Sequence, residues 1–269
     1  MAGWWARSHH RCALSQREMR GADCACTRDE IVCDLCPQPG CLTSYTRCRD
    51  LEPAVDTMTT SGGCGLFSIL QVKTNVKIGG ILAAPLTPFT RDGDVWMDAL
   101  PQYARYLDTH DIDGVFILGT MGEGMSLTVE ERKRVAEAWM TQIADTLRLK
   151  TVIVQVGAGN LKESVELARH AEEIGATAIA CMSPSYFKPT TEEVLVEYMA
   201  TVAAAAPTTP FYYYDINFMT GLYLNTARFL EVAGDKIPSL AGGKISSREL
   251  PTLLDCTLVA GALSSDDRN

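Results

Sequence analysis

The chain has 269 residues, 46% of them hydrophobic, and a formal net charge of −9 at pH 7. That length allows one large domain or two small ones, and the acidic balance argues against a nucleic-acid partner. No apolar run is long enough to span a membrane, and the opening MAGWWARSHH lacks the apolar core of a secretory signal. We therefore expect a cytoplasmic protein without membrane or nucleic-acid partners.

Residues 1–77 show no apolar periodicity and hold eight of the ten cysteines. These are Cys12, Cys24, Cys26, Cys33, Cys36, Cys41, Cys48 and Cys64. Cys33 and Cys36 have the spacing of zinc ligands, but no second pair at a matching spacing accompanies them. A disulfide scaffold would need an oxidising compartment, which nothing in the sequence supports. We interpret residues 1–77 as a disordered, Cys-rich extension whose removal should leave folding and activity unchanged.

From Ile78 onward, short apolar runs alternate with amphipathic stretches of helical period. The predicted strands cover residues 80–84, 114–118, 151–156, 178–182, 210–214 and 239–243, and a seventh begins at 257–260. Helix starts are indicated by Thr128 with Glu131, by Asn160, and by Thr190 with Glu193. This alternation predicts parallel βαβ units, and a strand spacing of roughly thirty residues suits a (β/α)8 TIM barrel. A doubly wound open sheet is the alternative, because alternation alone does not separate the two.

Residues 78–269 are too few for a whole barrel, which takes roughly 250 residues. The closing ALSSDDRN is polar and offers no further strand. We therefore expect residues 78–269 to form an incomplete barrel domain, truncated after strand seven. Because a barrel satisfies its strand edges by closing on itself, we expect this loss to lower activity.

The stretch Ser239–Leu250, SLAGGKISSREL, combines an apolar strand, two glycines, one lysine and a helix start. Ser246 followed by Glu249 is a capping box, which places Lys244 near the end of the strand. In a barrel that end is the catalytic face, where a desolvated amine has a lowered pKa and can attack a carbonyl. Taken alone, the stretch would favour a solvated lysine in a loop.

Two further motifs precede this lysine. GTMGEG, residues 119–124, follows a predicted strand, and strand 210–214 ends with Tyr214. The glycine motif has neither dinucleotide nor nucleotide spacing. Together with SPSYFKPT around Tyr186, the ordered motifs resemble the sialic acid aldolase and dihydrodipicolinate synthase family of class I lyases. The resemblance runs from about Ile78 to about Gly261.

The resemblance implies that Lys244 forms a Schiff base and that Tyr214 shuttles protons. The chemistry agrees with both roles. Cleaving a carbon–carbon bond beta to a carbonyl leaves a carbanion, and a protonated imine is the electron sink that makes this feasible. A phenol both donates and accepts hydrogen bonds, so it can serve the imine and the alkoxide.

The resemblance also implies binding roles for five residues. Gly119 and Thr120 match the loop that holds the pyruvyl carboxylate, with Met121 in place of the usual second hydroxyl residue. Ser246 matches a hydroxyl that touches substrate, although a helix N-cap explains it equally well. Tyr186 matches a tyrosine that some family members send into the site of a neighbouring subunit.

One position at which this sequence differs from the synthases of the family indicates the expected substrate. Met219 stands where the synthases usually carry an arginine, which favours the branch that splits N-acetylneuraminate into N-acetylmannosamine and pyruvate. That branch is homotetrameric and uses no cofactor, and no histidine here has the spacing of a metal ligand. Residues 215–217 read Asp-Ile-Asn, where these lyases usually carry His or Asn followed by Ile-Pro.

Two alternatives stay open. The enzyme could be another pyruvate-dependent class I aldolase, such as a hydroxy-oxoglutarate aldolase. A catalytically inactive, truncated product that only associates with full-length subunits is the other.

Overall fold

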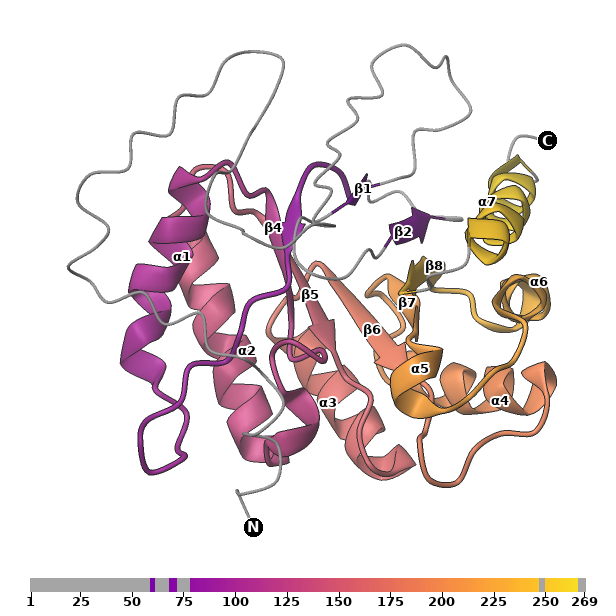
Figure 1. The fold of residues 1–269 in the computed structure, drawn as a ribbon, viewed down its shortest axis with the longest axis horizontal. Helices are drawn as coiled ribbons and strands as arrows, with labels where there is room; N and C mark the ends of the chain where they lie inside the picture. Colours follow the sequence, from indigo (N-terminus) through magenta and orange to yellow (C-terminus); the bar gives the residue numbers. More distant parts are fainter. Residues whose placement is uncertain (1–58, 61–67, 72–77, 247–249, 266–269) are drawn as a thin grey trace, which may run out of the picture. The chain divides into compact units, whose positions relative to one another are not determined.

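The computed structural model describes residues 59–60, 68–71, 78–246 and 250–265 (Figure 1). All of these residues belong to one compact unit, residues 51–269. Residues 1–50 lie wholly outside the described residues, and Cys33 and Cys36 are among them. The predicted disorder of the extension and its predicted boundary at residue 77 therefore stay predictions.

Six parallel strands stand side by side in chain order (Figure 1). They are β3 (Leu82–Ala83), β4 (Gly114–Ile117), β5 (Thr151–Gln155), β6 (Ala178–Met182), β7 (Phe211–Asp215) and β8 (Leu240–Ile245). A doubly wound sheet reverses its strand order at a switch point. The uninterrupted order seen here is that of a TIM barrel, as predicted.

The helices follow the strands one by one. They are α1 (Leu100–Thr109), α2 (Val129–Ala144), α3 (Leu161–Glu173), α4 (Glu192–Ala203), the short α5 (Asn217–Thr220), α6 (Thr226–Lys236) and α7 (Leu250–Ser265). Thr128 and Glu131 form the predicted capping box, and Asn160 caps α3. The predicted start of α4 was wrong by one residue, because Thr191 rather than Thr190 accepts the Val194 N–H.

The predicted seventh strand at 257–260 was wrong, because these residues lie within α7. Cys256 and Ala260 are buried four residues apart, whereas Leu254 and Leu258 are exposed. That spacing is helical. The β-branched residues Thr257 and Val259 suggested a strand, but packing of α7 on α6 determined the local structure.

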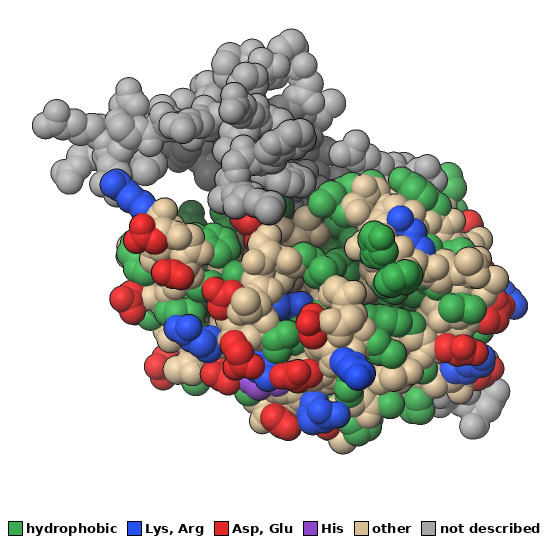
Figure 2. Space-filling view, turned by 90° about the horizontal axis from the view of Figure 1, so that it is seen from below, with side chains coloured by type: hydrophobic (Ala, Val, Ile, Leu, Met, Phe, Trp, Pro, Cys, Tyr) green, Lys and Arg blue, Asp and Glu red, His purple; other side chains and the backbone are tan. Residues whose placement is uncertain are grey.

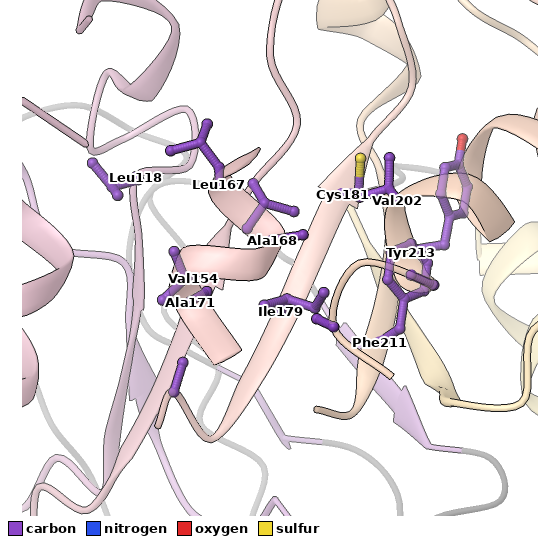
Figure 3. Close-up of a cluster of buried hydrophobic side chains, with 14 of the residues drawn as sticks. Leu118, Val154, Leu167, Ala168, Ala171, Ile179, Cys181, Val202, Phe211 and Tyr213 are labelled. Atoms are coloured by element: carbon purple, nitrogen blue, oxygen red, sulfur yellow. The ribbon is translucent and has the colours of Figure 1, made fainter. Parts of the chain in front are cut away.

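The two faces of the parallel sheet bury separate hydrophobic clusters. The outer cluster lies between the strands and the helices, and Figure 3 shows part of it, with Leu167, Ala168, Ile179, Cys181, Phe211 and Tyr213. The inner cluster contains Leu82, Phe116, Ile153, Ala178, Ala180, Tyr212, Tyr214 and Ala241, and none of the described helices contributes to it. A sheet face buried only by its own side chains must curl around them, as in a barrel.

Two further short strands extend the sheet beyond β8 (Figure 1). β2 (Ser68–Gln71) pairs antiparallel with β8, and β1 (Thr59–Thr60) pairs antiparallel with β2. Both fall within the stretch that the sequence assigned to the extension. The outer edge of β8 is therefore paired.

None of the helices in the described part of the chain is long and apolar enough to cross a bilayer. On the face seen in Figure 2, Lys and Arg side chains are scattered among Asp and Glu instead of forming one basic patch.

Candidate functional site

A β-bulge turns the Lys244 side chain into the barrel interior. Phe211 pairs with Leu240 but Tyr212 pairs with Gly242, so Ala241 is an extra residue in β8. Gly242 has a φ of 147°, a backbone conformation that favours glycine. If side chains alternated strictly from the inward-facing Ala241 with every residue kept, Lys244 would point outward. With it, Lys244 stands beside the inward-facing Tyr214.

Lys244 is almost fully buried, with 3% of its surface exposed. Its Nζ lies 3.7 Å from the ring centre of Tyr214, 4.5 Å from that of Phe116 and 3.4 Å from Ser246 Oγ. Burial lowers the pKa of the lysine to about 7, because the apolar surroundings disfavour the charged form. A sizeable fraction of the amine is therefore neutral and nucleophilic near pH 7.

Tyr214 links the lysine to the glycine-rich loop. Its hydroxyl lies 3.2 Å from Thr120 Oγ1, although the two residues are 94 positions apart in sequence. Burial raises the pKa of Tyr214, while hydrogen bonds with Thr120 and Ser246 lower it. The phenol accordingly keeps its proton at neutral pH and has two hydroxyl partners with which to exchange one.

The loop after β4 is held in an unusual conformation. Leu118 and Glu123 have φ values of 60° and 51°, in the left-handed region. Only glycine fits at position 124, because a Cβ there would lie 1.9 Å from the Leu118 carbonyl oxygen. Thr87 Oγ1 donates to the Gly122 carbonyl at 2.6 Å and ties the loop to the segment after β3. The loop is thus fixed beside Tyr214.

The predicted site residues separate into two groups. Lys244, Tyr214, Thr120 and Ser246 lie together, and a Cβ on Gly119 would meet the Phe116 ring at 2.7 Å. The other two predicted residues face outward: Met121 is about half exposed, and Tyr186 is 84% exposed. Tyr186 instead stacks edge-on against the equally exposed Phe187.

Sequence reasoning missed two residues that shape this site. Phe116 packs edge-on against Tyr214 with ring centres 5.2 Å apart, and only its inward position in strand 114–118 could have signalled this. Arg132 is buried and donates to the backbone oxygens of Gly157 and Gln155 at 2.9 and 2.6 Å. It fixes the end of β5, but nothing in its helical context distinguishes it from a surface arginine.

Asp215 faces away from Tyr214, as strand alternation predicts. Its Oδ2 accepts a hydrogen bond from Thr226 Oγ1 at 2.7 Å, on the helix side of the sheet. Burial raises the pKa of this carboxyl. Alongside burial, the charge of Asp215 nonetheless contributes to raising the pKa of Tyr214.

The described residues contain no group of three or more His, Cys, Asp or Glu side chains placed to hold a metal ion. What they offer is a desolvated amine beside a phenol, two hydroxyls and a glycine-rich loop. Such a set can attack a carbonyl, hold a carboxylate and move protons.

Comparisons with known proteins agree with this chemistry. The profile of the dihydrodipicolinate synthetase family matches residues 77–261. The N-acetylneuraminate lyases of Pongo abelii and Homo sapiens are each 44% identical over 181 residues, covering 67% of this chain and 56% of each lyase. The chain thus spans little more than half the length of these relatives.

Solved structures give the same picture. The Proteus mirabilis N-acetylneuraminate lyase matches with a TM-score of 0.66 at 40% identity, covering 69% of this chain and 62% of that one. The N-acetylneuraminate lyase (sialic acid aldolase) of Aliivibrio salmonicida matches with the same TM-score at 38% identity, covering 69% and 61%.

Proposed function

This chain belongs to the dihydrodipicolinate synthetase family, and we propose that it cleaves N-acetylneuraminate to N-acetylmannosamine and pyruvate through a Schiff base on Lys244. The observation that carries the proposal is the buried lysine, with its pKa near 7 and its Nζ 3.7 Å from the Tyr214 ring centre. The names of the matching relatives supply the substrate.

The first step needs a neutral amine. Lys244 Nζ attacks the keto carbon of the open-chain sugar acid, the carbonyl oxygen leaves as water, and a protonated imine forms. Burial that lowers the lysine pKa supplies the neutral amine. The substrate carboxylate is held by the Thr120 hydroxyl and by N–H groups of the 119–124 loop.

Bond cleavage needs a proton acceptor at the C4 hydroxyl. Tyr214 accepts that proton while its own passes through the Thr120 hydroxyl to the bound substrate carboxylate, so no free phenolate forms, and the proton returns to C3 of the enamine in the next step. The C3–C4 bond then breaks and its electrons move into the imine, which leaves an enamine of pyruvate. Protonation at C3 and addition of water release pyruvate and restore the amine.

We further propose that the enzyme is a cytoplasmic homotetramer. The exposed pair of Tyr186 and Phe187 supports a subunit contact. Exposing two adjacent large aromatic side chains to water is energetically unfavourable and is unusual on the surface of a monomer. Tyr186 would then reach the site of a neighbouring subunit.

Trapping tests the proposal. We expect incubation with pyruvate and borohydride to add one reduced pyruvyl group at Lys244, located by peptide mass spectrometry. Lys244→Ala should abolish the label, and Lys162→Ala, which changes an exposed lysine of α3, should leave it unchanged. Label at another residue would refute the assignment.

Turnover separates the alternatives. Pyruvate release from N-acetylneuraminate is followed with a coupled dehydrogenase, in protein free of host lyase. Release from a shorter oxo acid but not from the sugar would favour another pyruvate aldolase. Trapping without turnover on any aldol substrate would favour the inactive product.

A further inference from the structure

The edge of β8 that faces away from β7 determines how firmly the backbone around Lys244 is held. Lys244 follows Gly242 and Gly243, and glycine has more backbone freedom than any other residue. A lysine on such a backbone needs both edges of its strand held. β7 holds one edge of β8, and β2 lies along the other.

The hydrogen bonds show which residues face β2. Ser246 N–H donates to the Asp215 carbonyl at 2.9 Å, so Ser246 faces β7. In a strand, backbone groups alternate between the two edges, so Lys244 and Gly242 also face β7. Gly243 and Ile245, the two neighbours of Lys244, consequently present their N–H and C=O groups to β2.

The antiparallel register identifies their partners. Gly243 is opposite Leu70, and Ile245 is opposite Ser68. Opposite residues of an antiparallel pair exchange both hydrogen bonds when one of them faces the partner strand. Leu70 and Ser68 therefore face β8, whereas Ile69, which is opposite Thr59 of β1, faces the other way. β2 also contacts α7, the helix that follows β8.

From this arrangement we propose that β2 is the element that positions Lys244, by clamping the backbone on both sides of it from the edge where a further parallel barrel strand would pair. Leu70 and Ser68 are its positioning residues. The proposal concerns the backbone of β8 and does not rest on the proposed reaction. It predicts the reverse of the sequence-based expectation that residues 1–77 can be removed without effect.

Proline scanning of β2 provides a matched pair of variants. Leu70→Pro removes an N–H that faces β8, whereas Gln71→Pro removes one that faces away. In the 269-residue chain, hydrogen exchange is measured amide by amide. We expect the Gly243 and Ile245 amides to exchange about tenfold faster or more in Leu70→Pro, and near the original rate in Gln71→Pro. Val152 and Val154 of β5 report on the rest of the sheet.

Chemical reactivity gives a second readout that mere loss of stability would not produce. Pulsed acetylation over pH 6–10 measures the ionisation midpoint of Lys244 against the exposed Lys162 in the same sample. We expect the midpoint to rise in Leu70→Pro and to stay in place in Gln71→Pro. Unchanged exchange at Gly243 and Ile245 in Leu70→Pro would overturn the proposal. Equal loss of protection in both variants would overturn it as well.

Discussion

The buried lysine should destabilise the fold at neutral pH, and replacing it with methionine should relieve that cost. In water the lysine ammonium has a pKa of 10.5, and in the fold burial lowers it to about 7. At about 1.4 kcal/mol per pKa unit, the difference corresponds to about 5 kcal/mol. We expect the free energy of unfolding of Lys244→Met to exceed that of the parent chain by about 5 kcal/mol at pH 6.

The dependence on pH has a definite sign. Below pH 7 the lysine is protonated in both the folded and the unfolded state, so the whole cost is present. Between pH 7 and 10.5 the unfolded chain binds one more proton than the folded chain, so the free energy of unfolding rises with pH. The advantage of Lys244→Met should therefore shrink steadily over this range and vanish near pH 10.5.

Urea unfolding at several pH values measures this difference, with the buried Trp139 as a fluorescent probe. Other titrating groups are common to both proteins and cancel in the comparison. Lys162→Met, an exposed control, should change the free energy of unfolding by less than about 0.5 kcal/mol at every pH. A difference for Lys244→Met that does not vary with pH, or a methionine variant less stable at pH 6, would refute the reasoning.

Three other substitutions test the surroundings of the lysine. Tyr214→Phe removes the hydroxyl that contacts Thr120, so trapping of pyruvate should persist while sugar cleavage falls by about 10² or more in a steady-state assay. Gly124→Ala should lower the free energy of unfolding by about 2–4 kcal/mol, because its Cβ would meet the Leu118 oxygen, whereas Gly159→Ala has open space and serves as the control. Arg132→Lys loses the fork that binds two carbonyls of the β5 end and should cost about 2–3 kcal/mol by thermal or urea unfolding. Equal stability of the two glycine variants, or of Arg132→Lys and the parent, would contradict these contacts.

Features set by neighbouring residues were predictable from the sequence, and features set by distant contacts were not. The capping box of Thr128 and Glu131 is local, and so are the apolar runs that became β4 to β8. The motifs also indicated that Lys244 and Tyr214 belong together. The helix at 257–260 depends on contact with α6, and the pairing of β2 with β8 joins segments more than 170 residues apart. Neither leaves a local pattern.

The exposed position of Met121 shows a related limit. A motif identifies a position in a loop, but the direction of the side chain depends on the folded backbone around it. Leu118 and Glu123 take left-handed conformations that their sequence does not favour. The curvature that these residues impose on the 119–124 loop directs Thr120 toward Tyr214.

The direction of the Lys244 side chain depends on the number of residues between the bulge at Ala241 and the lysine. Deleting Gly243 would preserve every side chain of the site, yet it would place Lys244 opposite Tyr213, turning the lysine toward the helices and Ile245 toward the interior. Deleting the extra residue Ala241 would instead remove the bulge and leave Lys244 opposite Tyr214. Two one-codon deletions in the same strand should therefore have opposite consequences for the lysine. In alignments of related sequences, a gap placed after Lys244 instead of at the bulge would match the lysine to a position on the opposite side of the sheet.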